Sequence, residues 1–564
     1  MKFQKDLSKR AVVVFFALLL LVGLIAGLDY GKTTDEGTEF NILKANAAEY
    51  ACQIFGADSS IAQRLCDDVT RISENIERDH GVSAYYLFYP VGVVLNRISG
   101  RMLSLGWHAY TFLWFMAGCL ALYCLMRSLL NASRKLACTA TLMLYLTPRM
   151  FASGHFNNKD MVLLSLFLMV MAFGVKWIRE NRLHYGLGMA ICGALATNTK
   201  ILGAWCFGAM GIAFLIARLA AHSLDKRTLR DGILTILAFF AAFFLLTPAM
   251  WSDPVGHIRY ILAYAKEFSR FRFPILFEGK IYLTAQGERV PWYYLPKWML
   301  MTMPVSIQVL ALVGLIAAVK RAKKPASAIG VIGEGFTPWT SARLVLVVVL
   351  IGLVPLLYGM FSDMILYNGW RHFYFVYASV VVTAVYGLVC LRERFPKAKK
   401  AIAALTAAAL AVNGGIIAIS HPLQDSTFNL IASPFVGDDY ETDYWLLAAR
   451  PAMEKLADTG ENLTVTTNYS CTTVFNSALN TAPSKLRDKV TFTWKLSEAD
   501  VVLVWTAYHR AEEGYSMEEL QASADWLDVN DLVAPGWNEN GEFEEWFTID
   551  ACGVEVLKAY RRVG

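Results

Sequence analysis

The first residues able to do chemistry are two adjacent carboxylates, Asp35 and Glu36, which follow soon after an apolar run at the start of the chain. A carboxylate can take a proton from a hydroxyl group and so act as a general base. The same pair also fits an ordinary solvated turn, because Asp is a common helix N-cap and paired acids are frequent in exposed loops. Taken alone, this loop favours the solvated turn.

A denser polar cluster lies between two later apolar runs, at residues 153–160. It contains His155, Asn158, Lys159 and Asp160. Polar groups of this kind beside a bilayer usually bind a substrate or an ion. Lys159 suits a phosphate, and Asp160 or His155 suits a metal ion or the orientation of a substrate. A substrate site and a structural cluster are equally good interpretations at this point.

Arg371 ends the short turn 364–371, and His372 beside it begins another apolar run. At this position a cation faces the plane of the lipid headgroups. The segment 247–254 also ends an apolar run, with Pro248 to stop the helix and Trp251 to anchor it at the interface. An ordinary helix exit is the better interpretation of that segment.

The composition requires a membrane to surround these residues. The chain has 56% hydrophobic residues, 18% charged residues and a mean hydropathy of +0.40, which is unlike a water-soluble domain. Its net charge of +5 over 564 residues is small, and the basic residues form short clusters beside apolar runs. Nucleic acid is therefore excluded as a partner.

Because a span needs about 20 apolar residues, the sequence predicts a polytopic all-α membrane protein with about eleven spans. The least apolar of them is the run at residues 184–199. The predicted spans are 11–28, 107–129, 135–153, 161–178, 184–199, 201–219, 232–250, 298–319, 343–363, 372–390 and 401–420.

Basic residues mark the cytoplasmic ends of spans. With the N-terminus inside, one threading places every basic cluster on the cytoplasmic side. The clusters are Arg127/Arg134/Lys135, Lys176/Arg179/Arg182, Arg218/Lys226/Arg227, Lys320/Arg321/Lys323/Lys324 and Arg392/Arg394/Lys397/Lys399/Lys400. We therefore expect a multi-pass plasma-membrane protein whose first span is a retained signal anchor. Its outer segments are 29–106, 154–160, 251–297, 364–371 and everything after Ser420.

The chain divides into a transmembrane module at 1–420 and a polar, extracytoplasmic tail at 421–564. Short strands are expected in the tail at 461–467, 489–494 and 501–505, and helices at 452–457 and 517–526. This pattern predicts a small α/β domain.

Cysteine usage fits an extracytoplasmic compartment for part of the chain. Among ten cysteines there is no CxxC pair, and six fall inside apolar runs. The other four are Cys52, Cys66, Cys471 and Cys552. An oxidising compartment permits disulfides there, and whether Cys52 pairs with Cys66, or Cys471 with Cys552, stays open.

Together the motifs resemble the protein mannosyltransferase-like family of GT-C glycosyltransferases, also called glycosyltransferase family 39. The resemblance covers residues 1 to about 450. It rests on Asp35-Glu36 past the first span, His-x-Asn-Asn-Lys-Asp at 155–160, Thr-Pro-x-x-Trp-x-x-Pro at 247–254, Arg371-His372-Phe373, His421-Pro422 and Asp443-Tyr444-Trp445.

The resemblance implies a GT-C-like fold and an enzyme that transfers a hexose or pentose, with inversion, from a polyprenyl-phosphate donor at the outer face of the membrane. It implies that Asp35 is the catalytic base and Glu36 its neighbour in acceptor or metal binding. Substrate contacts, mainly to the donor phosphate, are implied for His155, Asn158, Lys159, Asp160, Arg371 and His372. The acceptor is a protein, a lipid or a cell-wall glycan, and a divalent metal ion remains an open expectation.

A secondary transporter of a polar or anionic solute is the alternative, since it also has many spans and positive-inside loops. Transporters usually bury an ionisable pair or a broken helix near the membrane midplane. Here the ionisable residues gather at the outer ends of spans, with Lys200 as the main exception. A non-catalytic scaffold is a third class, but it does not need polar clusters in several outer loops.

Overall fold

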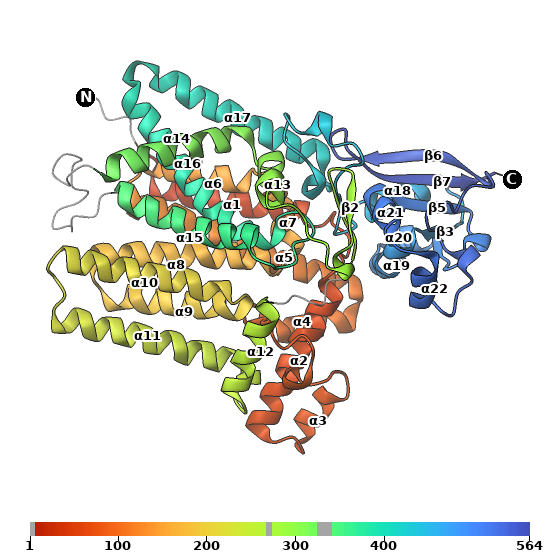
Figure 1. Cartoon of the computed structure of the whole chain (residues 1–564), viewed down its shortest axis with the longest axis horizontal. Coiled ribbons are helices and arrows are strands. Elements are labelled where there is room, and N and C mark those ends of the chain that lie inside the picture. The colour runs from red at the N-terminus through yellow and green to blue at the C-terminus, as the bar shows by residue number, and fades with distance from the viewer. Residues whose placement is uncertain (1–5, 267–272, 324–340, 564) are drawn as a thin grey trace.

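The computed structural model describes residues 6–266, 273–323 and 341–563, so Lys324 of the basic clusters lies outside it. Most of the described chain is helical, and Figure 1 shows long helices side by side, with a small sheet domain at one end. The long helices are α1 (Lys9–Ala26), α5 (Gly100–Leu129), α8 (Asp160–Glu180), α9 (Leu183–Thr199), α10 (Leu202–Ala220), α11 (Lys226–Leu246), α14 (Val305–Ala322), α15 (Ser341–Phe361), α16 (Tyr374–Arg394) and α17 (Lys399–Ser420).

Nine helices of the described residues are long and apolar enough to cross a membrane, and each coincides with a predicted span. The predicted span 135–153 instead forms α6 (Arg134–Tyr145) and α7 (Pro148–Phe156), because Pro148 starts a new helix at its first turn. The predicted span 184–199 is helical as α9. Its 17 residues extend about 26 Å, slightly less than a hydrocarbon core of about 30 Å.

Helix α8 lies at the centre of the bundle, where α5, α9, α10 and α16 pack against it. The apolar windows of α8 and α16 are each 83% buried, whereas that of α17 is 6% buried. Small residues permit the closest approaches, as is usual between membrane helices. A Cβ atom at Gly314 would overlap the carbonyl oxygen of Thr383, so α14 and α16 touch through their backbones. This core fixes the helix ends that carry the polar clusters.

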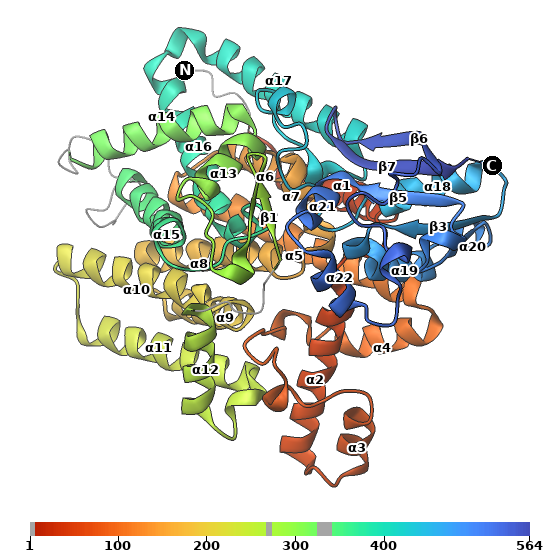
Figure 2. The ribbon, with the colours of Figure 1, turned by 45° about the vertical axis from the view of Figure 1, so that its right-hand side comes forward.

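The predicted outer segments gather at the end of the bundle that carries the sheet domain (Figures 1 and 2). After α1 come α2 (Glu36–Phe55), α3 (Ser60–Cys66) and α4 (Tyr89–Ile98). After α11 come α12 (Pro254–Lys266), the hairpin β1 (Ile275–Phe277) and β2 (Lys280–Tyr282), and α13 (Tyr294–Thr302). Residues distant in sequence therefore meet at one end of the protein.

The tail folds around a five-stranded sheet of order β4-β3-β5-β7-β6. The predicted strands are confirmed as β3 (Leu463–Thr467), β4 (Val490–Phe492) and β5 (Val501–Trp505), and they run parallel. Antiparallel β6 (Phe543–Asp550) and β7 (Glu555–Arg562) were not predicted, because they carry acidic and basic residues that are unusual in strands. The remaining helices are α18 (Ala449–Asp458), α19 (Thr472–Thr481), α20 (Ser484–Arg487), α21 (Thr506–Glu512) and α22 (Met517–Ser523).

All ten cysteines fall within the described residues, and each is free. The Sγ atoms of Cys52 in α2 and Cys66 in α3 lie 3.6 Å apart. Cys471 is buried in the sheet domain, and Cys552 lies in the turn between β6 and β7. Whether either pair forms a disulfide stays open.

Candidate active site

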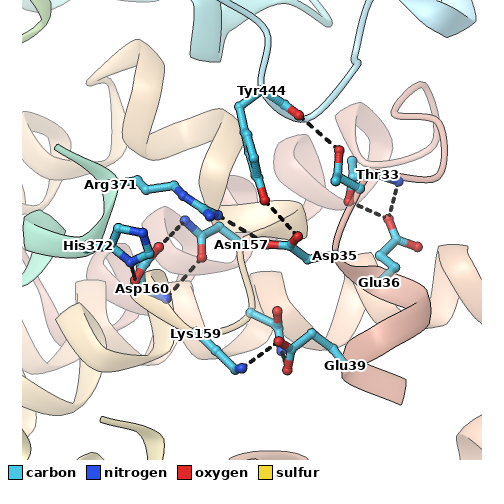
Figure 3. A network of polar contacts seen from close by, with 12 residues as sticks. Thr33, Asp35, Glu36, Glu39, Asn157, Lys159, Asp160, Arg371, His372 and Tyr444 are labelled. Carbon is cyan, nitrogen blue, oxygen red and sulfur yellow. Dashed lines mark hydrogen bonds and ion pairs between the residues drawn. The ribbon is translucent and has the colours of Figure 1, made fainter. Parts of the chain in front are cut away.

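Asp35 precedes the first residue of α2 and faces two distant parts of the chain. Its Oδ2 accepts a hydrogen bond from Nη1 of Arg371 at 3.1 Å, and its Oδ1 accepts one from the Tyr444 hydroxyl at 2.9 Å (Figure 3). Within the described chain this carboxylate makes no helix-capping hydrogen bond. The side chain is 32% exposed, so it is held at both oxygens and still accessible. This geometry favours a site over a solvated turn.

Glu36 is adjacent in sequence but points into the protein, away from Arg371 (Figure 3). One oxygen accepts from the Thr33 backbone at 2.8 Å and lies 2.6 Å from Nε2 of His108, and the other accepts from Ser104 at 2.7 Å. Burial alone would raise the pKa of Glu36, but His108 and the hydrogen bonds outweigh burial and lower it. The carboxylate therefore fastens the start of α2 to α5.

Arg371 begins the short 3-10 helix η6 (Arg371–Phe373) and is buried. Its guanidinium lies 4.0 Å from the ring centre of Tyr444 and 5.1 Å from that of Trp445. Aromatic faces attract cations, and the planar guanidinium stacks where an ammonium does not. The tail thus supplies both a cage for the arginine and a second hydrogen bond to Asp35.

Next to Arg371, the side chain of His372 belongs to a second polar cluster. Asp160, the first residue of α8, accepts from Nδ2 of Asn157 at 2.9 Å and pairs with Lys200. Nζ of Lys200, at the end of α9, lies 2.9 Å from Nδ1 of His372. Burial lowers the pKa of Lys200, and Asp160 opposes that shift. We call this pair, Lys200–Asp160, and the neighbouring pair Lys159–Glu39 the lysine pairs.

Lys159 and Asn158 both contact Glu39 of α2. Nζ of Lys159 lies 2.6 Å from one Glu39 oxygen, and Asn158 donates to the other at 3.2 Å. Figure 3 shows this pair below Asp35, with α2 on one side and the α7–α8 turn on the other. The lysine pairs therefore connect α2, α8 and α9 around the site.

The structure does not bring His155 to Asp35 or Arg371. Its ring nitrogens each lie 2.9 Å from a backbone oxygen, of Phe151 and of Gly23, and its ring stacks on Phe112 at 4.4 Å. These contacts pack α7 against α1 and α5. His155 and Asp160 thus have other partners than a metal ion. No group of three or more His, Cys, Asp or Glu among the described residues could hold one, and a divalent metal stays an expectation.

Three contact residues of this site were given no role from the sequence: Glu39, Lys200 and Tyr444. Lys200 had a usable signal, since it is a lone cation between two apolar runs. Tyr444 belongs to the Asp-Tyr-Trp motif of the family resemblance, but its distance from Asp35 along the chain hides the contact. Glu39 follows Asp35 and Glu36 by one helical turn, and only the fold shows that it faces Lys159.

Residues 95–251 match the family model described as dolichyl-phosphate-mannose-protein mannosyltransferase. These residues are protein mannosyltransferase-like. The matched segment contains the whole polar cluster at 153–160 and Lys200, whereas Asp35 and Arg371 lie on either side of it. The predicted resemblance is therefore confirmed for the segment between the two ends of the site.

Solved structures with similarity along the chain include ArnT from Cupriavidus metallidurans bound to undecaprenyl phosphate, at 12% identity, a TM-score of 0.44 and 98% coverage of both chains. The oligosaccharyltransferase AglB from Archaeoglobus fulgidus has 11% identity and a TM-score of 0.42, with 98% of this chain and 74% of that chain covered. The arabinofuranosyltransferase AftD from mycobacteria has 13% identity and a TM-score of 0.40, with 99% and 40% covered. A comparison with curated proteins gives no significant match.

Proposed function

We propose that this chain transfers a sugar from a polyprenyl-phosphate donor to an acceptor hydroxyl, with inversion, at the non-cytoplasmic face of the membrane. The observation that carries the proposal is the Asp35 carboxylate, which Arg371 and Tyr444 hold in place while about a third of the side chain stays exposed. The family match of residues 95–251 supports the same reaction class.

In this reaction Asp35 takes the proton of the acceptor hydroxyl as the acceptor oxygen bonds to the anomeric carbon. The bond from that carbon to the phosphate oxygen breaks, and its electron pair leaves with the polyprenyl phosphate. A carboxylate oxygen has two lone-pair sites, so each oxygen of Asp35 keeps one site free beside its present hydrogen bond. Arg371, fixed by the aromatic rings, is placed to stabilise the charge that develops on the phosphate.

The position of Asp35 suits a lipid-borne donor. A sugar on a polyprenyl chain cannot leave the bilayer, so its reacting carbon stays at the headgroup plane. Asp35 follows soon after α1, and Arg371 begins η6, which leads directly into α16, so both lie where candidate spans end. With the N-terminus in the cytoplasm, this end and the tail lie outside the cell.

The transporter alternative is weaker on geometry. Transporters usually bury an ionisable pair or a broken helix near the membrane midplane. The Lys200–Asp160 pair lies at helix ends, with Asp160 beginning α8 and Lys200 following α9. The break between α6 and α7 is a feature that a transporter would share.

The test is sugar transfer by the full chain in membranes from radiolabelled polyprenyl-phosphate hexoses and pentoses. We expect Asp35→Asn to lower transfer by about 10²- to 10⁴-fold, the usual contribution of a general base. Asp29→Asn is the matched control, because Asp29 lies in the same loop, is 60% exposed and has one ion pair among the described residues, to His421. The anomeric configuration of the product, measured by NMR, reports inversion.

If the intact chain transfers no sugar from this panel but moves a solute across vesicles, the transporter alternative replaces the proposal. If transfer occurs and Asp35→Asn leaves it unchanged, the enzyme class stands and the base is another residue.

A further inference from the structure

The segment that leads from α17 into the sheet domain changes abruptly from buried to exposed. Residues 423–429 are all buried, whereas Leu430, Ile431 and Phe435 have exposed fractions of 68%, 64% and 78%. The last of them belongs to the short 3-10 helix η9 (Ser433–Phe435). We call residues 430–435 the apolar loop. Large apolar side chains gathered at one exposed place mark a surface that another body covers.

The sheet domain that follows does not repeat this pattern. In the described part of residues 441–563, the large apolar side chains that are exposed are Met517, Trp526 and Val563, which are separated in sequence. Single exposed apolar residues are normal on a domain that faces water. The apolar loop is therefore a distinct feature of the tail.

Hydrogen bonds hold the apolar loop beside the start of α14. The backbone of Asn429 donates to the carbonyl oxygen of Met301 at 2.8 Å, and its Nδ2 donates to that of Met303 at 3.0 Å. Its Oδ1 accepts from the backbone of Ile431 and of Ala432, both at 3.1 Å. Because α14 is a candidate span that begins just after these carbonyl groups, the loop lies at the depth where a span ends.

The apolar loop continues the lipid-facing surface of the spans. Leu430 lines one apolar surface together with Val305 of α14 and Ile416 of α17. Ile419, in the last turn of α17, is 77% exposed, and the apolar window of α17 is only 6% buried. Helix α17 therefore faces lipid along most of its length. A surface that joins such a helix without a break meets the same surroundings.

The composition of this segment suits the boundary between lipid chains and headgroups. Residues 426–437 carry no charged side chain, and Asp438 and Asp439 follow directly. Aromatic and aliphatic side chains collect at that depth, whereas carboxylates stay in water. Non-helical backbone near lipid needs hydrogen-bond partners, and the carbonyl oxygen of Asn429 accepts from the backbone of Ala432 and Ser433.

The apolar loop also contacts the sheet domain. Oγ of Ser433 donates to the carbonyl oxygen of Cys552 at 3.2 Å, in the turn between β6 and β7. Strand β6 is an edge strand of the sheet, and in Figures 1 and 2 this edge lies beside the end of α17. A loop that is fixed in lipid therefore restrains this edge of the sheet.

We propose that the apolar loop inserts Leu430, Ile431 and Phe435 into the headgroup region of the bilayer and so anchors the sheet domain to the membrane surface. The partner is the phospholipid bilayer itself, and the anchor does not depend on sugar transfer. A protein partner is the competing occupant. Continuity with α14 and α17 favours lipid, because a protein that covered the loop would also displace lipid from the ends of both helices.

The test is photolabelling of the full chain in nanodiscs of phosphatidylcholine and phosphatidylglycerol. A small share of the phospholipid carries a diazirine in its acyl chain, and mass spectrometry of peptides locates the label after irradiation. We expect the peptide with residues 429–436 to carry about tenfold more label than the peptide with Trp526. Trp526 is the internal control, because it is 64% exposed and follows α22, which lies away from α17 in both ribbon views.

The combined variant Leu430→Ser, Ile431→Ser and Phe435→Ser should lose about tenfold of the label on the loop and keep the label on α17. Deuterium exchange in the turn between β6 and β7 should become about tenfold faster, because the edge of the sheet loses its anchor. Trp526→Ser is the matched control, since it removes an exposed apolar side chain from the same tail and should change neither measurement. Thermal unfolding verifies that each variant is folded.

Label on α17 with none on the loop would overturn the anchor and leave a protein partner as the occupant. Equal label on the loop and on the peptide with Trp526 would also overturn it, because contact with lipid would not be specific to the loop. Unchanged exchange in the folded triple variant would contradict the anchoring of the sheet. Labelling of the intact chain needs no substitution, so it decides the proposal even if the triple variant does not fold.

Discussion

Two groups of cations lie near Asp35, and they differ in what their nitrogen atoms already bind. Lys159 and Lys200 each face a carboxylate, Glu39 and Asp160, and both pairs connect one helix to another. Arg149 and Arg371 also face carboxylates, Asp425 and Asp35, but each keeps an Nε group without a partner in the described chain. A cation beside a candidate site is therefore not by itself a ligand contact. The two lysines join helices, whereas an arginine with an unbound N–H group can still bind a ligand.

The largest effect is expected at the Lys200–Asp160 pair. Removing one partner of a buried ion pair leaves an uncompensated charge, so we expect Lys200→Met to destabilise the chain by about 3–5 kcal/mol. The double variant Lys200→Met with Asp160→Asn should recover most of that loss, because no unpaired charge remains. Thermal unfolding in detergent measures both effects. A folded double variant that transfers sugar more than about 100-fold more slowly than the intact chain would assign Lys200 to the substrate.

The next largest effect is expected at Arg371. Arg371→Lys keeps a positive charge but loses the hydrogen-bond fork and the stacking on Tyr444 and Trp445. We expect kcat/KM for sugar transfer to fall by about 100-fold, close to the loss of one preorganised donor to a developing charge. The control Arg450→Lys should leave kcat/KM unchanged, because Nε of Arg450 donates to Glu454 at 2.7 Å and not to Asp35. A similar loss in both variants would mean that Arg371 has no special role.

Much of the fold was predictable because bilayer burial is a strong constraint. Apolar length and basic clusters located the nine helices that match predicted spans. The break at Pro148 was the main feature missed there, because the apolar run 135–153 continues through the proline. Strands β6 and β7 of the tail were missed because their charged side chains hide the alternating pattern of a strand.

The site was predictable in part. The resemblance indicated Asp35 and Arg371, and the structure brings their side chains together. It also indicated His155, whose contacts lie instead with backbone oxygens of α1 and α7. The local sequence does not show which way a side chain points once the chain has folded. Arg149 of α7, Trp298 of α13 and Arg371 of η6 come from separate segments, and only their packing shows that their unpartnered donors converge on one pocket.

Asp35 and Glu36 are adjacent in sequence, but Asp35 is accessible whereas Glu36 is buried and holds α2 to α5. Glu36→Gln replaces an acceptor by a donor that must face Ser104, Thr33 or His108. A buried unsatisfied group of this kind costs about 1–3 kcal/mol. We therefore expect lower thermal stability but nearly unchanged transfer per folded molecule, the reverse of Asp35→Asn. Loss of transfer at unchanged stability would instead place Glu36 with the substrate.

The smallest expected effect concerns pH and Glu441. Its pKa is raised to about 8 by burial, so the group is neutral below that pH and negatively charged above it. A carboxylate repels the donor phosphate that Arg371 is proposed to contact, so kcat/KM for sugar transfer should fall by about tenfold as pH rises through 8, the equivalent of one pKa unit of interaction.

The groups that face Glu441 are Arg371, Tyr294 of α13 and Tyr508 of α21, together with the backbone at Asn368 and Gly369. The arginine stays charged, and burial raises the pKa of both tyrosines well above 10, so none of them titrates between pH 7 and 9. Asp443, in the wall of the same pocket as Glu441, does titrate in this range, since burial raises its pKa to about 7. Glu441→Gln separates the two: it should abolish the decline centred near pH 8 and keep any change near pH 7. If the variant declines as the intact chain does, Glu441 does not face the phosphate.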